Sequence, residues 1–170
     1  LKASKLSATQ IRNGWLHHIY SEEDAPLFQK FPTSTPIVEN FLWVSNEQAR
    51  KLMQTGMSPP ETSEPANNRN YMMIDAQLTT EIFGLLAPSR PDVAIDIAYL
   101  PVRTTAMGDA QWISQFYIAM HSLASVVDKS ETLANQTLWL AEQGSSYLPP
   151  SSTPAKMYAF IKEHYLNNPN

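Results

Sequence analysis

The stretch that decides the fold is Asp109-Ala-Gln-Trp-Ile-Ser-Gln-Phe-Tyr-Ile-Ala-Met-His-Ser-Leu-Ala-Ser-Val-Val127. Its spacing predicts a helix over residues 110–127, with Asp109 as a good N-cap. A helix that is apolar on more than one side is normally central and buried. The large apolar side chains of this stretch do cover more than one side: Trp112, Ile113, Phe116, Tyr117, Met120, Leu123 and Val127.

Outward from this helix, start and stop signals recur in both directions. Ser7, Ser45 with its capping-box partner Gln48, and Ser130 are predicted helix caps. Further helices are predicted at 7–19, 45–56, 71–86, 93–100, 130–144 and from 152 or 153 onward, with loops at 20–36 and 57–70. No segment alternates apolar and polar residues, so we expect one all-α domain over residues 1–170.

Composition narrows the class of protein. Of the 170 residues, 43% are hydrophobic and 16% charged, which suits a globular protein with a real core. The net charge of −4 and the scattered Lys and Arg residues argue against a nucleic-acid partner. The chain has no cysteine, which excludes disulfides and thiolate chemistry. No apolar run reaches the roughly 18 residues of a membrane span, so we expect a soluble protein. The cytoplasm is the favoured location, but the lack of cysteine does not fix the compartment.

Four segments carry recognisable motifs in a fixed order. They are Met53-Gln-Thr-Gly-Met-Ser-Pro-Pro-Glu-Thr62 with the Asn-rich run after it, Ile74-Asp-Ala-Gln-Leu-Thr-Thr-Glu-Ile-Phe-Gly-Leu-Leu-Ala-Pro88, the loop around Thr105 and Gly108 with Phe116 to Ala124, and Gly144-Ser-Ser-Tyr-Leu-Pro-Pro-Ser-Ser152. Together they resemble the ADP-ribosylglycohydrolases over nearly the whole chain. Three features depart from that family: Met72 and Asp75 replace an acidic residue and a glycine, Ala106 replaces a histidine, and residues 26–44 resemble an insertion.

The resemblance implies a multi-helix orthogonal bundle and a particular chemistry. Members of the family cleave ADP-ribose from modified proteins or from small ADP-ribose conjugates, using two Mg²⁺ ions held by oxygen ligands. Their metal motifs, of Thr-Asp-Asp and Asp-x-Asp-Thr type, are absent here. The nearest acidic clusters, Glu22-Glu23-Asp24 and the pair Asp92 and Asp96, offer too few ligands.

We therefore expect an incomplete bundle that begins after the first metal motif and ends before the second. The metal ligands would lie outside this chain, in the rest of the same polypeptide or in a complementing chain. Alone, the chain should be inactive, and it should leave an apolar helix face exposed. Two rival interpretations stay open: a catalytically inactive relative with a structural or binding role, and an unrelated helical interaction module.

Candidate substrate-binding residues lie in three places. The connector 103–109 opens onto a helix N-terminus, which favours anions; Gly108 permits close approach, and Arg103 is a candidate phosphate partner. Each candidate also has an ordinary structural interpretation. The connector 103–109 can simply join two helices, with Asp109 as the cap of the second. Asn68 can belong to a solvated loop, and Gln77 can be an interior amide whose hydrogen bonds are satisfied. The full set of candidates is Arg103, Thr105, Gly108, Asp109, Asn68 and Gln77.

Overall fold

The computed structural model describes residues 5–19 and 42–167, and within these ranges the regular elements are helices without any strand. The all-α prediction is therefore confirmed for the described part of the chain. The elements are α1 (Ala8–His18), α3 (Val44–Gln54), the 3-10 helix η2 (Glu61–Ser63), α4 (Asp75–Thr80), α5 (Ile82–Leu86), α6 (Pro91–Val102), α7 (Asp109–Leu123), α8 (Leu133–Ser146) and α9 (Thr153–Asn167). The acidic run 22–24, the loop 20–36 and most of the insertion-like region 26–44 lie outside the described residues.

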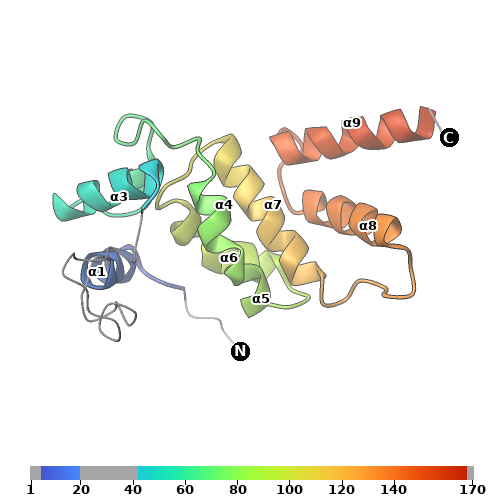
Figure 1. The fold of residues 1–170 in the computed structure, drawn as a ribbon, viewed down its shortest axis with the longest axis horizontal. Helices are drawn as coiled ribbons and strands as arrows, with labels where there is room; N and C mark the ends of the chain where they lie inside the picture. Colours follow the sequence, from blue (N-terminus) through green and yellow to red (C-terminus); the bar gives the residue numbers. More distant parts are fainter. Residues whose placement is uncertain (1–4, 20–41, 168–170) are drawn as a thin grey trace, which may run out of the picture.

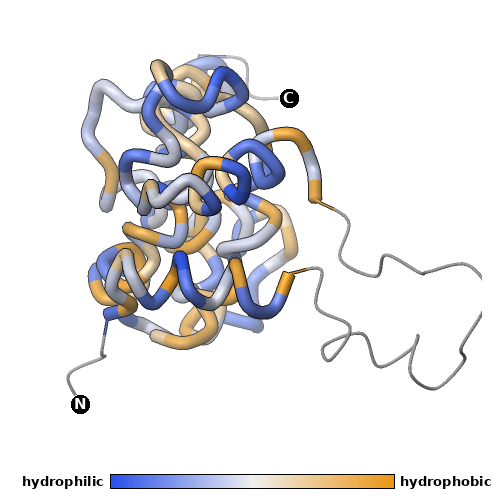
Figure 2. Tube along the Cα trace, turned by 90° about the vertical axis from the view of Figure 1, so that its left-hand side faces the viewer, coloured by the Kyte–Doolittle hydropathy of each residue, from blue (hydrophilic) through white to orange (hydrophobic). Residues whose placement is uncertain are grey.

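Helix α7 is central, as its sequence predicts. It packs against α4, α5 and α6 on one side and against α8 and α9 on the other (Figure 1). Helices α1 and α3 contact each other beside this body, and the Arg12 Nε donates to the carbonyl oxygen of Met53 across that contact. Apolar and polar segments alternate along the whole described trace, so the apolar residues come from several elements and not from one (Figure 2).

The buried side of α7 differs from the side that its large residues suggest. Apart from the fully buried Ile118, its most enclosed side chains are short or polar, among them Ser114, Ala119 and Ser122, whereas Tyr117 is exposed. Short side chains let neighbouring helices approach closely. The surrounding core follows the same pattern and consists mainly of alanine: Ala76, Ala87, Ala94, Ala98, Val102, Ala106, Ala110 and Ile118.

Helices α5 and α7 approach until their backbones are in contact at Gly84. A Cβ atom built on Gly84 would lie 2.5 Å from the carbonyl oxygen of Ile118 and 2.6 Å from the Cβ of His121. Gly144 of α8 approaches the same helix less closely, with an added Cβ 3.0 Å from the Cγ of Met120. The lack of a side chain at both glycines therefore allows α5 and α8 to lie close against α7.

Helix caps agree only in part with the predictions. Ser7 forms a capping box with Gln10 at the start of α1, which confirms that cap. Ser45 does not cap α3, because the helix already begins at Val44 and Trp43 at the N-cap position makes no side-chain hydrogen bond. Two other caps shift by one or two residues: Gly108 precedes Asp109 at α7, and Thr132 rather than Ser130 caps α8.

The single helix predicted over 71–86 is wrong in two respects. Regular structure begins only at Asp75, and it is interrupted at Glu81 between α4 and α5. The hydroxyls of Thr79 and Thr80 donate to the carbonyl oxygens of Asp75 and Ala76, four residues earlier. Such bonds compete with the main-chain ladder and bend helices. The interruption follows immediately after these two threonines.

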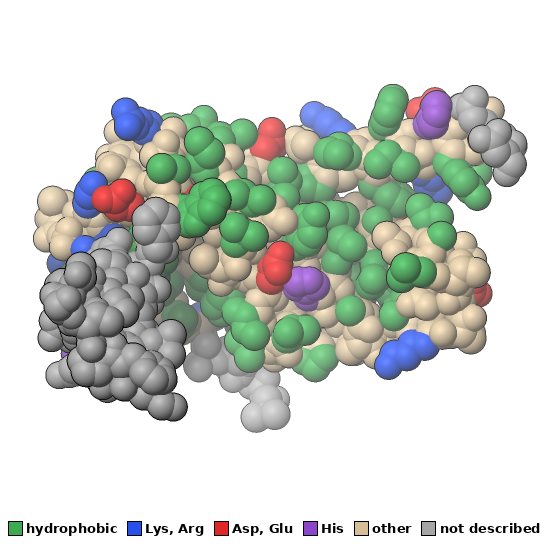
Figure 3. Space-filling view, viewed as in Figure 1, with side chains coloured by type: hydrophobic (Ala, Val, Ile, Leu, Met, Phe, Trp, Pro, Cys, Tyr) green, Lys and Arg blue, Asp and Glu red, His purple; other side chains and the backbone are tan. Residues whose placement is uncertain are grey.

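An apolar surface runs along α4 and α5, within the stretch predicted as one helix over 71–86. Leu78 is 57% exposed and Leu85 is 62% exposed. We call this surface the α4–α5 apolar face, and it consists of Met72, Met73, Ile74, Leu78, Ile82, Leu85 and Leu86. Figure 3 shows hydrophobic side chains over the middle of this view and along α8 and α9. The predicted exposed apolar helix face is thus present.

The ion pair between Glu142 of α8 and Lys162 of α9 yields a first prediction. The hydrogen bond from Lys162, followed by its charge, lowers the pKa of the Glu142 carboxyl below its ordinary value. A lowered folded-state pKa means that the pair's stabilisation is present at neutral pH and disappears as the pH falls through that value. We expect Lys162→Met to move the pKa of Glu142 upward in a carbon-13 NMR titration.

The Asp128 carboxyl is the internal control for this titration. Its pKa is lowered by hydrogen bonds from Ser130 and owes nothing to Lys162. The Asp128 carboxyl should therefore titrate identically in the wild-type protein and in Lys162→Met. A Glu142 titration curve that does not move in Lys162→Met would contradict the ion pair.

Candidate functional site

The connector between α6 and α7 is enclosed by the segments around it. The carbonyl oxygen of Thr104 accepts from the Thr62 hydroxyl at 2.8 Å, and that of Thr105 accepts from the Ser45 hydroxyl at 2.9 Å. The Met107 N–H donates to the carbonyl oxygen of Tyr71 at 3.2 Å. The connector is thus bonded to α3 and to two points of the 57–74 segment.

Asn68 is fully buried, which corrects its interpretation as part of a solvated loop. Its Nδ2 donates to the carbonyl oxygen and the hydroxyl of Ser45, both at 3.2 Å, and its Oδ1 accepts from the Asn70 N–H at 3.0 Å. Since Ser45 also contacts Thr105, two of the predicted candidates meet at one serine. Ser45 was recognised in the sequence only as a helix cap.

Arg103 directs its guanidinium into the protein. Its side chain is 9% exposed, its Nε donates to the Ser63 hydroxyl at 2.9 Å, and another nitrogen pairs with Glu64. A longer bond of 3.4 Å reaches the Tyr99 hydroxyl. A phosphate at Arg103 would therefore compete with three partners, of which Ser63 and Glu64 join residues 57–74 to the end of α6.

Asp75 is buried at the junction of α3 and α4. Its Oδ1 accepts the backbone N–H groups of Ser45 at 3.1 Å and of Asn46 at 3.0 Å, in the first turn of α3. The carboxylate thus replaces the cap that Trp43 does not provide. The carboxylate oxygen Oδ2 and the amide oxygen of Asn46 are buried without a hydrogen-bond partner in the described protein.

Gly108 and Asp109 form the outer part of the connector. Gly108 has φ 64° and ψ −134°, a backbone conformation open almost only to glycine, and the Met72 sulfur lies 3.4 Å from where a Cβ would stand. Asp109 is exposed, and its carboxylate accepts from the hydroxyl of Thr153 at the start of α9. Gln77 lies half-buried on α4 and takes no part in the bonds described above.

The described residues do not fit a magnesium pair. Within 5–19 and 42–167, no three His, Asp or Glu side chains come together as a metal site requires. Asp92 pairs with Arg90, whose hydrogen bond lowers the pKa of that carboxyl, and Asp96 pairs with Lys5. The two carboxylates, four positions apart in α6, therefore each form an ion pair with a different basic side chain.

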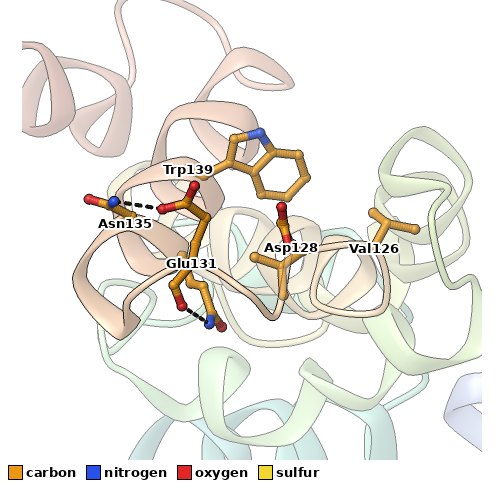
Figure 4. Close-up of a pocket in the computed structure, with 7 residues that line it drawn as sticks. Val126, Asp128, Glu131, Asn135 and Trp139 are labelled. Atoms are coloured by element: carbon orange, nitrogen blue, oxygen red, sulfur yellow. Dashed lines mark hydrogen bonds between the residues drawn. The ribbon is translucent and has the colours of Figure 1, made fainter.

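A hollow of about 450 Å³ lies away from the connector, between the loop that follows α7 and the first half of α8 (Figure 4). Trp139 lies beside two carboxylates there, but Asp128 already accepts two bonds from Ser130, and Glu131 accepts from Asn135. The acidic groups of this hollow thus have local partners. It shares no residue with the hydrogen bonds around the connector.

Comparisons with protein-family models, with curated proteins and with solved structures each found no match. Among the described helices, none combines the length and the apolar character that crossing a membrane requires.

Proposed function

We propose that this chain is the middle part of an ADP-ribosylglycohydrolase-like domain. The complete domain would cleave ADP-ribose from modified proteins or from small ADP-ribose conjugates with two Mg²⁺ ions. The four sequence motifs support this proposal if their segments meet at a shared site.

The observation that carries the proposal is the convergence of the motif segments around one end of α7. The first segment reaches the connector through Thr62. The second is linked to it through Ser45, whose N–H donates to Asp75 and whose hydroxyl donates to the carbonyl oxygen of Thr105. The fourth leads into Thr153, which bonds to Asp109. A shared site requires that segments separated by up to about 90 positions meet in this way.

The motif glycines provide separate support. Gly84 of the second motif and Gly144 of the fourth both lie against α7, which carries the third motif. A glycine is expected where two backbones must approach closely. The second and third motifs are joined again by the Ser122 hydroxyl, which donates to the carbonyl oxygen of Ala87.

The α4–α5 apolar face supports the idea that further helices belong to this fold. Contiguous exposed apolar surface usually marks a contact with another protein segment. Since the described residues supply no magnesium site, the ligands for both ions would come from polypeptide beyond them. In such a domain the outward part of the connector, Gly108 and Asp109, is the accessible candidate for substrate contact.

The proposal is tested by assaying release of ADP-ribose from a modified peptide. The intact polypeptide that contains this chain should release ADP-ribose with Mg²⁺ and should lose that activity in EDTA, recovering it when Mg²⁺ is restored. The 170-residue chain alone should release none. If the intact protein releases no ADP-ribose under either condition, the catalytically inactive relative becomes the better description.

A further inference from the structure

The first turn of α3 is stabilised from another element. Four N–H groups at the start of any α-helix lack partners within the helix, and Trp43 contributes no side-chain cap to α3. Asp75, thirty positions later than Ser45, accepts two of these groups with a single oxygen. A carboxylate at a helix N-terminus also interacts favourably with the helix dipole.

Because α3 begins at Val44, Ser45 lies past the N-cap position and its hydroxyl is available for other partners. A serine that caps its own helix would direct its oxygen toward the N–H groups of the first turn. Here the Ser45 hydroxyl instead donates to the carbonyl oxygen of Thr105, and it accepts from the Asn68 amide. One serine therefore holds both the connector and the Asn-rich segment.

We propose that Asp75 is a positioning residue for the candidate site. By fixing the first turn of α3, it fixes Ser45, and Ser45 in turn sets the positions of Asn68 and Thr105. The assignment of the site rests on the proposed function, but the mechanical coupling is a property of this chain. Asp75 itself is 2% exposed, so the proposed role acts through Ser45 rather than through direct contact with a substrate.

The coupling makes a specific prediction for amide hydrogen exchange in the 170-residue chain. Asp75→Ala removes the acceptor of the Ser45 and Asn46 amides, so their exchange should accelerate about tenfold or more, the effect of one lost hydrogen bond. The Met107 and Tyr71 amides should accelerate with them, although neither touches Asp75. Asp75→Asn keeps one oxygen acceptor and should largely restore slow exchange.

Two further variants separate positioning from general loss of stability. Ser45→Ala should accelerate exchange at Met107 and Tyr71 and leave the Asn46 amide protected by Asp75. Leu148→Ala removes a buried side chain after α8 and should destabilise the fold without selectively accelerating these amides. If Asp75→Ala accelerates only Ser45 and Asn46, or if Leu148→Ala gives the same pattern, the positioning role is refuted.

The release assay is a separate arm on the intact protein. Asp75→Ala and Leu148→Ala are assayed the same number of degrees below their own melting temperatures. Asp75→Ala should then have a KM about tenfold or more above that of Leu148→Ala, since displaced binding groups weaken substrate contacts. Altered exchange with no ADP-ribose release even by the wild-type protein would refute the proposed function while upholding the coupling. Unchanged KM in an active enzyme would refute the link between Asp75 and the site.

Discussion

Replacing Gly84 with alanine is expected to destabilise the fold by about 3 kcal/mol. The added Cβ would meet the carbonyl oxygen of Ile118 at 2.5 Å, and a backbone oxygen inside a helix cannot rotate away. The helices α5 and α7 would have to separate, which would disturb the alanine core beside them. The ordinary gain of about 0.5–1 kcal/mol from removing a helical glycine offsets only a small part of this cost.

Gly14 is the matched control because it is also a helical glycine, in the middle of α1. An added Cβ there meets nothing within 4 Å. Gly14→Ala should therefore stabilise the protein slightly, and Gly84→Ala should lower the melting temperature by about 6–12 °C. Thermal unfolding followed by circular dichroism measures both. Equal melting temperatures for the two variants would mean that α5 and α7 are not in backbone contact.

Arg103→Ala is the second variant with a large expected effect, a loss of about 2–4 kcal/mol. The change removes the guanidinium that joins the connector to Ser63, Glu64 and Tyr99, and it leaves the buried Ser63 hydroxyl with one partner fewer. The cost lies below that of a fully buried ion pair because the Glu64 side chain is 38% exposed and can be hydrated.

Arg90→Ala provides the comparison, since Arg90 pairs with Asp92 at a site where the arginine side chain is 64% exposed. Exposed ion pairs contribute about 0–1 kcal/mol, so this variant should unfold close to the wild-type denaturant midpoint. Urea titration of the three proteins tests the contrast. A midpoint for Arg103→Ala near that of Arg90→Ala would show that Arg103 has little structural role and is available for a ligand.

The sequence predicted the helical class and the central place of α7 because these depend on long, strongly apolar segments. It also identified the Ser7 capping box, a local signal that needs no tertiary partner. What it could not reveal is the buried side of α7, because Ser114, Ala119 and Ser122 have no hydrophobic periodicity. Their burial follows from the close approach of other helices.

The candidate site shows the same division between local and long-range signals. Asn68 and Arg103 were identified as residues of interest, but their buried partners Ser45 and Ser63 could not be foreseen, since these bonds join positions 23 and 40 apart. Asp75 was recognised as unusual, whereas its role at α3 depends on a contact across thirty positions. Ser45 was assigned to its own helix end, and the carboxylate that replaces it there belongs to a different element.

The alanine-lined interior has a consequence for how this sequence can vary. Ala94, Ala98 and Ala106 have no exposed surface, so a larger residue at any of them would need space that the neighbouring helices occupy. Evolutionary drift at these positions should be confined to glycine, serine and alanine. In a saturation-mutagenesis library, folded variants should therefore include other hydrophobic residues at Leu85 but not leucine at Ala98. This result would reverse the usual expectation that greater apolarity inside a protein is harmless.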